Sequence, residues 1–188
     1  LQLIANGQQD QAINIQTLPD HSLQGRINIQ DSIVDVSGNG VEQMQIRGGS
    51  ALIQDSDLYA NNKGNVNHIE ASAVDIKVTN LQVNHSLITS DAFLEGNGGS
   101  MSVSSDGLLS LVNGGRIRVA TVDAGDAGAI TINADEILID GQGNKSTNID
   151  KFTGIDSRTK GSGNAGAINI TSKGLISILD DGLVNSDT

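Results

Sequence analysis

Apolar and polar residues alternate in short runs along most of the chain. The runs 130–132 and 168–170 both read Ile-x-Ile, with a polar residue at x. Alternation at period two is typical of a β-strand with one buried face, whereas an amphipathic helix repeats its apolar residues at every third or fourth position. The sequence therefore predicts an all-β protein.

The alternating runs belong to an internal repeat. Four similar segments begin with glycine, at 64–71, 96–103, 125–132 and 163–170, and the last two are nearly identical. Their first glycines are spaced by 32, 29 and 38 residues. Helical-pair repeats hold their length tightly, while a coil of β-strands tolerates insertions at its turns, so the elastic spacing favours stacked β-coils.

Each repeat contains three strand-like runs. The first lies in the glycine-led segment, the second follows about six residues later and the third comes after a polar turn. In the fifth repeat these runs are 130–132, 137–139 and 154–157. In the third repeat the same alignment places the first run within 64–71 and the other two at 74–76 and 87–90. Upstream, less regular runs fill two coils: 12–15, 26–29 and 33–36, then 44–46, 51–53 and 57–59.

We therefore predict one right-handed parallel β-helix, or solenoid, over residues 1–188, with about six coils of three short strands each. The expected coils are 11–43, 44–67, 68–99, 100–128, 129–166 and an incomplete 167–188. Neighbouring coils then lie about 4.8 Å apart, which places isoleucine over isoleucine in the core. Asparagine at the turns is expected to adopt left-handed backbone geometry and to bond to the equivalent residue of the next coil.

The composition suits a narrow core that is filled by small aliphatic side chains and needs few aromatic residues. Aromatic residues make up 2% of the chain and hydrophobic residues 37%, with 23 Gly and one Pro. The absence of Cys excludes disulfides and thiolate metal sites. A net charge of −11 without a basic cluster argues against nucleic acid as a partner. No apolar run approaches 18 residues, so no membrane-spanning helix is expected.

The segments 125–132, 163–170 and 26–40 carry a resemblance to filamentous haemagglutinin-like proteins, the exported partners of two-partner secretion systems, in the variant common in filamentous cyanobacteria. The resemblance covers essentially the whole chain and implies a rod outside the cell or on the bacterial outer surface. It also implies an outer-membrane transporter as a partner of the parent protein. The Asn-Pro-Asn motifs of the family's secretion domain are missing, since Pro19 follows Leu18. We therefore expect an internal shaft segment of a longer chain.

No catalytic residue, metal ligand or cofactor site is predicted. The acidic pair Asp180 and Asp181 belongs to a different strand and coil from the basic residues Arg116 and Arg118, so these residues are expected to be solvated. His21, His68 and His85 show no metal-ligand spacing. Acidic pairs such as Asp55 and Asp57 lack the oxygen-ligand pattern of an EF-hand loop, and the threonines form no regular ranks of the ice-binding type.

One insertion is a possible binding loop. The longest repeat carries extra residues over 141–152, where Lys145, Lys151 and Phe152 stand out in an acidic, aromatic-poor chain. Loops on rigid scaffolds often hold binding function. A turn insertion without a binding role is the alternative interpretation.

The expected function is that of a structural or adhesive shaft in a surface protein, which mediates adhesion, aggregation or matrix contacts and is not an enzyme. Surface polysaccharide, other cells and end-to-end association through open coil edges are the expected contacts. The alternative is a carbohydrate-binding or pectate-lyase-like carbohydrate-cleaving β-helix, which predicts acidic and basic residues clustered across neighbouring coils.

Overall fold

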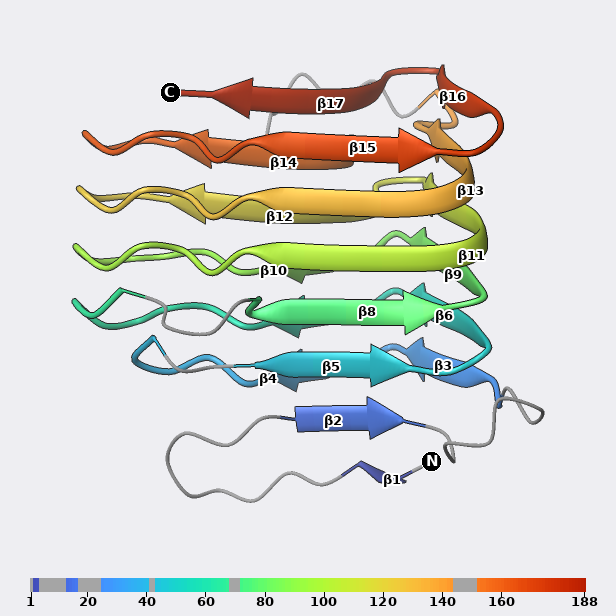
Figure 1. The fold of residues 1–188 in the computed structure, drawn as a ribbon, viewed down its shortest axis with the longest axis horizontal. Coiled ribbons are helices and arrows are strands. Elements are labelled where there is room, and N and C mark those ends of the chain that lie inside the picture. The colour runs from blue at the N-terminus through green and yellow to red at the C-terminus, as the bar shows by residue number, and fades with distance from the viewer. Residues whose placement is uncertain (1, 4–12, 17–24, 41–42, 68–71, 144–151) are drawn as a thin grey trace.

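The computed structural model describes residues 2–3, 13–16, 25–40, 43–67, 72–143 and 152–188. These residues form a right-handed parallel β-helix, whose successive coils stack from the N-terminal to the C-terminal side (Figure 1). The described part of the chain contains no helix. All strand pairs are parallel except that of β1 (Gln2–Leu3) with β2 (Ile13–Gln16). The predicted fold class is confirmed.

Each coil contributes one strand to each of three faces, and two of these faces belong to one continuous sheet. The first arm of the larger sheet contains β2, β5 (Met44–Arg47), β8 (Val74–Val78), β15 (Ile168–Ser172) and the first halves of β11 (Met101–Val112) and β13 (Ile130–Asp140). The second arm contains β3 (Ile27–Gln30), β6 (Ser50–Gln54), β9 (Asn80–Asn84), β16 (Ile176–Leu179) and the second halves of β11 and β13. The smaller sheet contains β4 (Ile33–Asp35), β7 (Asp57–Tyr59), β10 (Leu87–Thr89), β12 (Arg116–Thr121), β14 (Thr153–Thr159) and β17 (Gly182–Asp187).

The core consists of columns of aliphatic side chains that run along the stack. On the first arm, Ile76 lies in register with Ile46 of the preceding coil and Val103 of the next, and all three are fully buried. Each buried aliphatic side chain contributes roughly 1.5–3 kcal/mol through removal from water. Because every coil supplies the same small cross-section, the core needs no large aromatic residue.

The strand assignment within the third coil is corrected by the register. Its first strand is β8 and its second is β9, because Val74 pairs with Met101 and Leu81 pairs with Leu109. Of the segment 64–71, in which the first run was expected, residues 64–67 precede β8 without forming a strand, and 68–71 fall outside the described residues. Gly64 stands farther ahead of its strand than Gly96 does, so alignment on the glycines displaced this coil by one strand.

A left-handed residue recurs at the turn that leads from the second arm to the smaller sheet. The residues with φ of 45° to 51° at this turn are Asp31, Asp55, His85, Asn113, Gln142 and Asp180. Only Asn113 among them is asparagine, and no other asparagine of the described residues has a positive φ, so the expected left-handed role of asparagine is wrong at the other turns. The predicted polar ladder occurs in the glycine motif, where the Asn97 amide donates to Asn67 Oδ1 at 3.1 Å and the Asp126 amide donates to Asn97 Oδ1 at 2.8 Å.

The glycines of the motif permit close approach between coils. A Cβ added to Gly125 would lie 2.3 Å from the carbonyl oxygen of Gly96, and one added to Gly163 would lie 2.1 Å from that of Gly125. Neither contact is compatible with the observed coil spacing. The repeated glycine is therefore a requirement of stacking at this turn.

Candidate functional site

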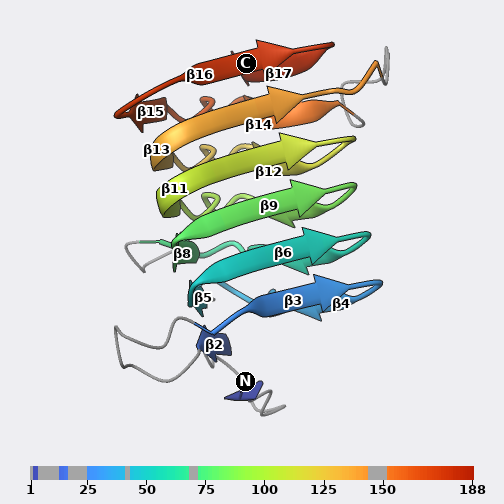
Figure 2. The ribbon, with the colours of Figure 1, turned by 90° about the vertical axis from the view of Figure 1, so that its right-hand side faces the viewer.

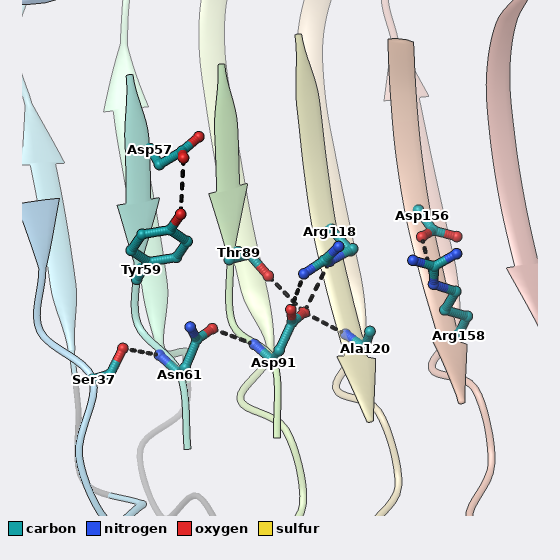
Figure 3. A network of polar contacts seen from close by, with 10 residues as sticks. All are labelled: Ser37, Asp57, Tyr59, Asn61, Thr89, Asp91, Arg118, Ala120, Asp156 and Arg158. Carbon is teal, nitrogen blue, oxygen red and sulfur yellow. Dashed lines mark hydrogen bonds and ion pairs between the residues drawn. The ribbon is translucent and has the colours of Figure 1, made fainter. Parts of the chain in front are cut away.

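Polar side chains of neighbouring coils meet on the outward face of the smaller sheet (Figure 3). One row consists of equivalent positions on five strands: Tyr59, Thr89, Arg118, Asp156 and Asn185. A second row lies two residues farther along the chain and includes Asn61, Asp91, Ala120 and Arg158. Alternation places both rows outside the coil, while Leu58, Ile88, Ile117 and Ile155, each of which directly precedes a residue of the first row, belong to the core.

Asp91 is the most extensively bonded side chain of this face. Its carboxylate accepts hydrogen bonds from Thr89 Oγ1 at 2.6 Å and the Ala120 amide at 2.9 Å, and it pairs with the Arg118 guanidinium, whose Nε lies 3.1 Å from Oδ1. Its own amide donates to Asn61 Oδ1 at 2.7 Å. Asp91 is 3% exposed. A buried carboxylate with this many donors connects three coils and leaves little capacity for a ligand.

A second ion pair lies within β14, the strand that follows β12 in the smaller sheet. Arg158 Nε is 3.3 Å from Asp156 Oδ2, and Asn185 Nδ2 donates to Asp156 Oδ1 at 3.2 Å. Asp156 is fully buried and Arg158 is 6% exposed. Burial raises the pKa of the Asp156 carboxyl, against the opposing effects of Asn185 and Arg158.

Phe152, the described member of the predicted binding loop, packs against the same cluster. The guanidinium of Arg116 lies 5.3 Å from the centre of the Phe152 ring, in cation–π geometry. Both side chains are buried, so the ring is not presented to solvent. Burial, followed by the charge of Arg118, lowers the pKa of Arg116 to about 10, which leaves it protonated at neutral pH. Lys145 and Lys151 lie outside the described residues, and the binding role of the loop stays a prediction.

Sequence reasoning missed the acidic partners of the arginines. Asp180 and Asp181 lie in the turn between β16 and β17, away from this face. Asp91 and Asp156, by contrast, lie one coil to either side of Arg118. Stacking the third-strand runs residue by residue would have brought these acids beside Arg118, whereas a search for adjacent acidic pairs in sequence did not.

His85, the histidine within the described residues, is one of the left-handed residues at the turn between the second arm and the smaller sheet. His85 Nδ1 lies 2.8 Å from Asp55 Oδ1 on the exposed surface, and this hydrogen bond is the main cause of a lowered pKa of the Asp55 carboxyl. His21 and His68 lie outside the described residues. Within the ranges that the structure describes, no three His, Asp or Glu side chains are grouped to hold a metal ion. The same ranges include no helix able to cross a membrane.

Tyr59 provides a spectroscopic probe of this face. Its hydroxyl donates to Asp57 Oδ2 at 2.8 Å, and burial, followed by Asp57, raises the pKa of the phenol from 10.0 to about 12. We expect ultraviolet absorbance to report ionisation near pH 12, because the chain has one Tyr and no Trp. The raised pKa contributes stability that is complete below pH 10 and is lost as the pH rises through 12. Titration near pH 10 in protein that circular dichroism shows to be folded would contradict the bonded geometry.

Comparisons with protein family models, curated proteins and solved structures found no match to the chain. The function is therefore argued from the fold and from the groups on its faces.

Proposed function

We propose that the chain is a structural and adhesive shaft segment of a secreted or cell-surface protein of the filamentous haemagglutinin-like type. The observation that carries this proposal is the unbroken stack of coils, in which core columns and turn ladders repeat along the axis. A parallel stack extends by about 4.8 Å per coil, so such a chain sets reach and rigidity. The Arg118–Asp91 ion pair of the smaller sheet supports this role, because it joins one coil to the next.

The proposal includes partners and a location. The parent protein would cross the outer membrane through a dedicated transporter and act outside the cell, where its shaft contacts surface polysaccharide or other cells. End-to-end contacts between copies are part of the same proposal.

A carbohydrate-cleaving β-helix is the second candidate, and the acidic and basic rows of the smaller sheet are the observation that favours it. Against it, Asp91 and Asp156 are buried and bonded to Arg118, Arg158 or Asn185. A general acid or base needs access to its substrate. We therefore prefer a non-enzymatic role. New reducing or unsaturated ends after incubation with pectin, alginate or cyanobacterial polysaccharide would favour the enzyme instead.

A bead assay tests the adhesive shaft. Beads coated with the chain are expected to bind polysaccharide-bearing bacterial cells and to aggregate with one another, because many rods on each bead present their lateral faces at once. Beads coated with an unrelated acidic globular protein of similar net charge serve as the control. Adhesion and aggregation no greater than those of the control beads would refute the proposal. Microscopy scores bead–cell and bead–bead contacts separately.

A further inference from the structure

A groove lies on the outward side of the second arm, where β3, β6 and β9 stack one above another (Figure 2). It encloses about 350 Å³, within the range of small-ligand sites. The side chains on which the argument depends are Arg26, Leu52, Asn80, Gln82 and Leu108. They come from successive coils, so the groove crosses the strands and follows the long axis of the stack.

The polar groups of this groove retain hydrogen-bonding capacity. Within the described part of the chain, the side chains of Arg26 and Gln82 form no hydrogen bond or ion pair. Arg47 and Arg118, in contrast, pair with Asp75 and Asp91. Asn80 uses Oδ1 to accept the Leu108 amide at 2.9 Å, which fixes its side chain and leaves Nδ2 as a donor. Arg26 and Gln82 are both exposed.

The charge and chemistry of the lining select one class of ligand. No carboxylate of the described residues lines the groove, although the chain as a whole carries a net charge of −11. A guanidinium binds a carboxylate through two parallel hydrogen bonds. Amide groups bond to hydroxyls, and the side chains of Leu52 and Leu108 offer apolar surface to the carbon face of a ring.

We propose that this groove binds an acidic oligosaccharide, with the carboxylate of a uronic acid unit at Arg26, hydroxyls at Asn80 and Gln82, and sugar rings over Leu52 and Leu108. The inference rests on the proposed adhesive function and specifies the ligand class and the face that makes the contact. Each site is small and partly open, so single contacts are weak. Many copies of the protein on one surface would strengthen the contact by multivalency.

Titration with trigalacturonate, followed by NMR chemical-shift changes, tests the site. The wild-type chain is expected to bind trigalacturonate and to bind neutral maltotriose at least about tenfold more weakly, since maltotriose lacks the carboxylate that pairs with Arg26. Arg26→Gln is expected to lower the affinity for trigalacturonate by about tenfold or more. Arg47→Gln, which removes an arginine of the first arm, is the matched control and should leave binding unchanged.

Several results would overturn the inference: no binding of trigalacturonate, equal binding of both sugars, or an Arg26→Gln variant with wild-type affinity. Preferential binding of an extended acidic peptide would assign the groove to protein partners and would also overturn it. The outcome is separable from that of the bead assay. Beads that adhere while trigalacturonate fails to bind would refute only the groove, and a titratable groove on non-adhesive beads would refute only the adhesive shaft.

Discussion

Replacing Asp91 by alanine is expected to lower the free energy of unfolding by about 3–5 kcal/mol, the usual cost of removing one partner from a buried ion pair. The change leaves Arg118 without its carboxylate and deprives Thr89 Oγ1 and the Ala120 amide of their acceptor. Urea denaturation followed by circular dichroism measures the loss.

The matched control for this variant is Asp123→Ala, in an exposed turn of the following coil. It removes the same charge from the surface, so its effect should stay within about 0.5 kcal/mol. A double-mutant cycle of Asp91→Ala with Arg118→Met should give a coupling energy of about 0.5–3 kcal/mol. Equal losses for Asp91→Ala and Asp123→Ala would refute the structural role of the buried carboxylate.

The sequence predicts the architecture well because the same constraint acts at every coil. Period-two alternation and repeated glycine motifs identify the fold class, since each inward position must match its stacked equivalents. The prediction fails in the third coil for a physical reason. More residues separate Gly64 from β8 than separate Gly96 from β11, so the glycine does not determine the register of β8.

The candidate site is less predictable, because its contacts join residues one coil apart. Thr89, Asp91 and Arg118 form one network although the last two are separated by 27 residues. Only the correct register reveals such neighbours. Burial is a further obstacle to predicting the site from sequence. An aromatic residue in an insertion, such as Phe152, suggests an exposed binding residue, yet its ring packs under the Arg116 guanidinium. The groove at Arg26 gave no sequence signal, since its lining comes from four successive coils of unrelated local sequence.

Replacing Gly128 by alanine is the second change with a large expected effect. The added Cβ would lie 2.5 Å from both the carbonyl carbon and oxygen of Gly99 and 2.7 Å from the Ser100 nitrogen, all of them backbone atoms of the preceding coil. Because Gly128 has coils on both sides, separation of the chain ends does not relieve the clash. We expect a loss of about 3 kcal/mol, at the upper end of overpacking costs, measured by the same urea denaturation.

Gly143→Ala separates the two reasons why a coil needs glycine. Gly143 has a φ of +69° and no atom within 4 Å of an added Cβ, so alanine there incurs only the left-handed backbone cost of about 1–2 kcal/mol. Gly128 has no positive φ, so its cost comes only from contact with the neighbouring coil. A Gly128→Ala variant no less stable than Gly143→Ala would mean that the coils can separate at this turn, and the glycine motif would then need another explanation than close stacking.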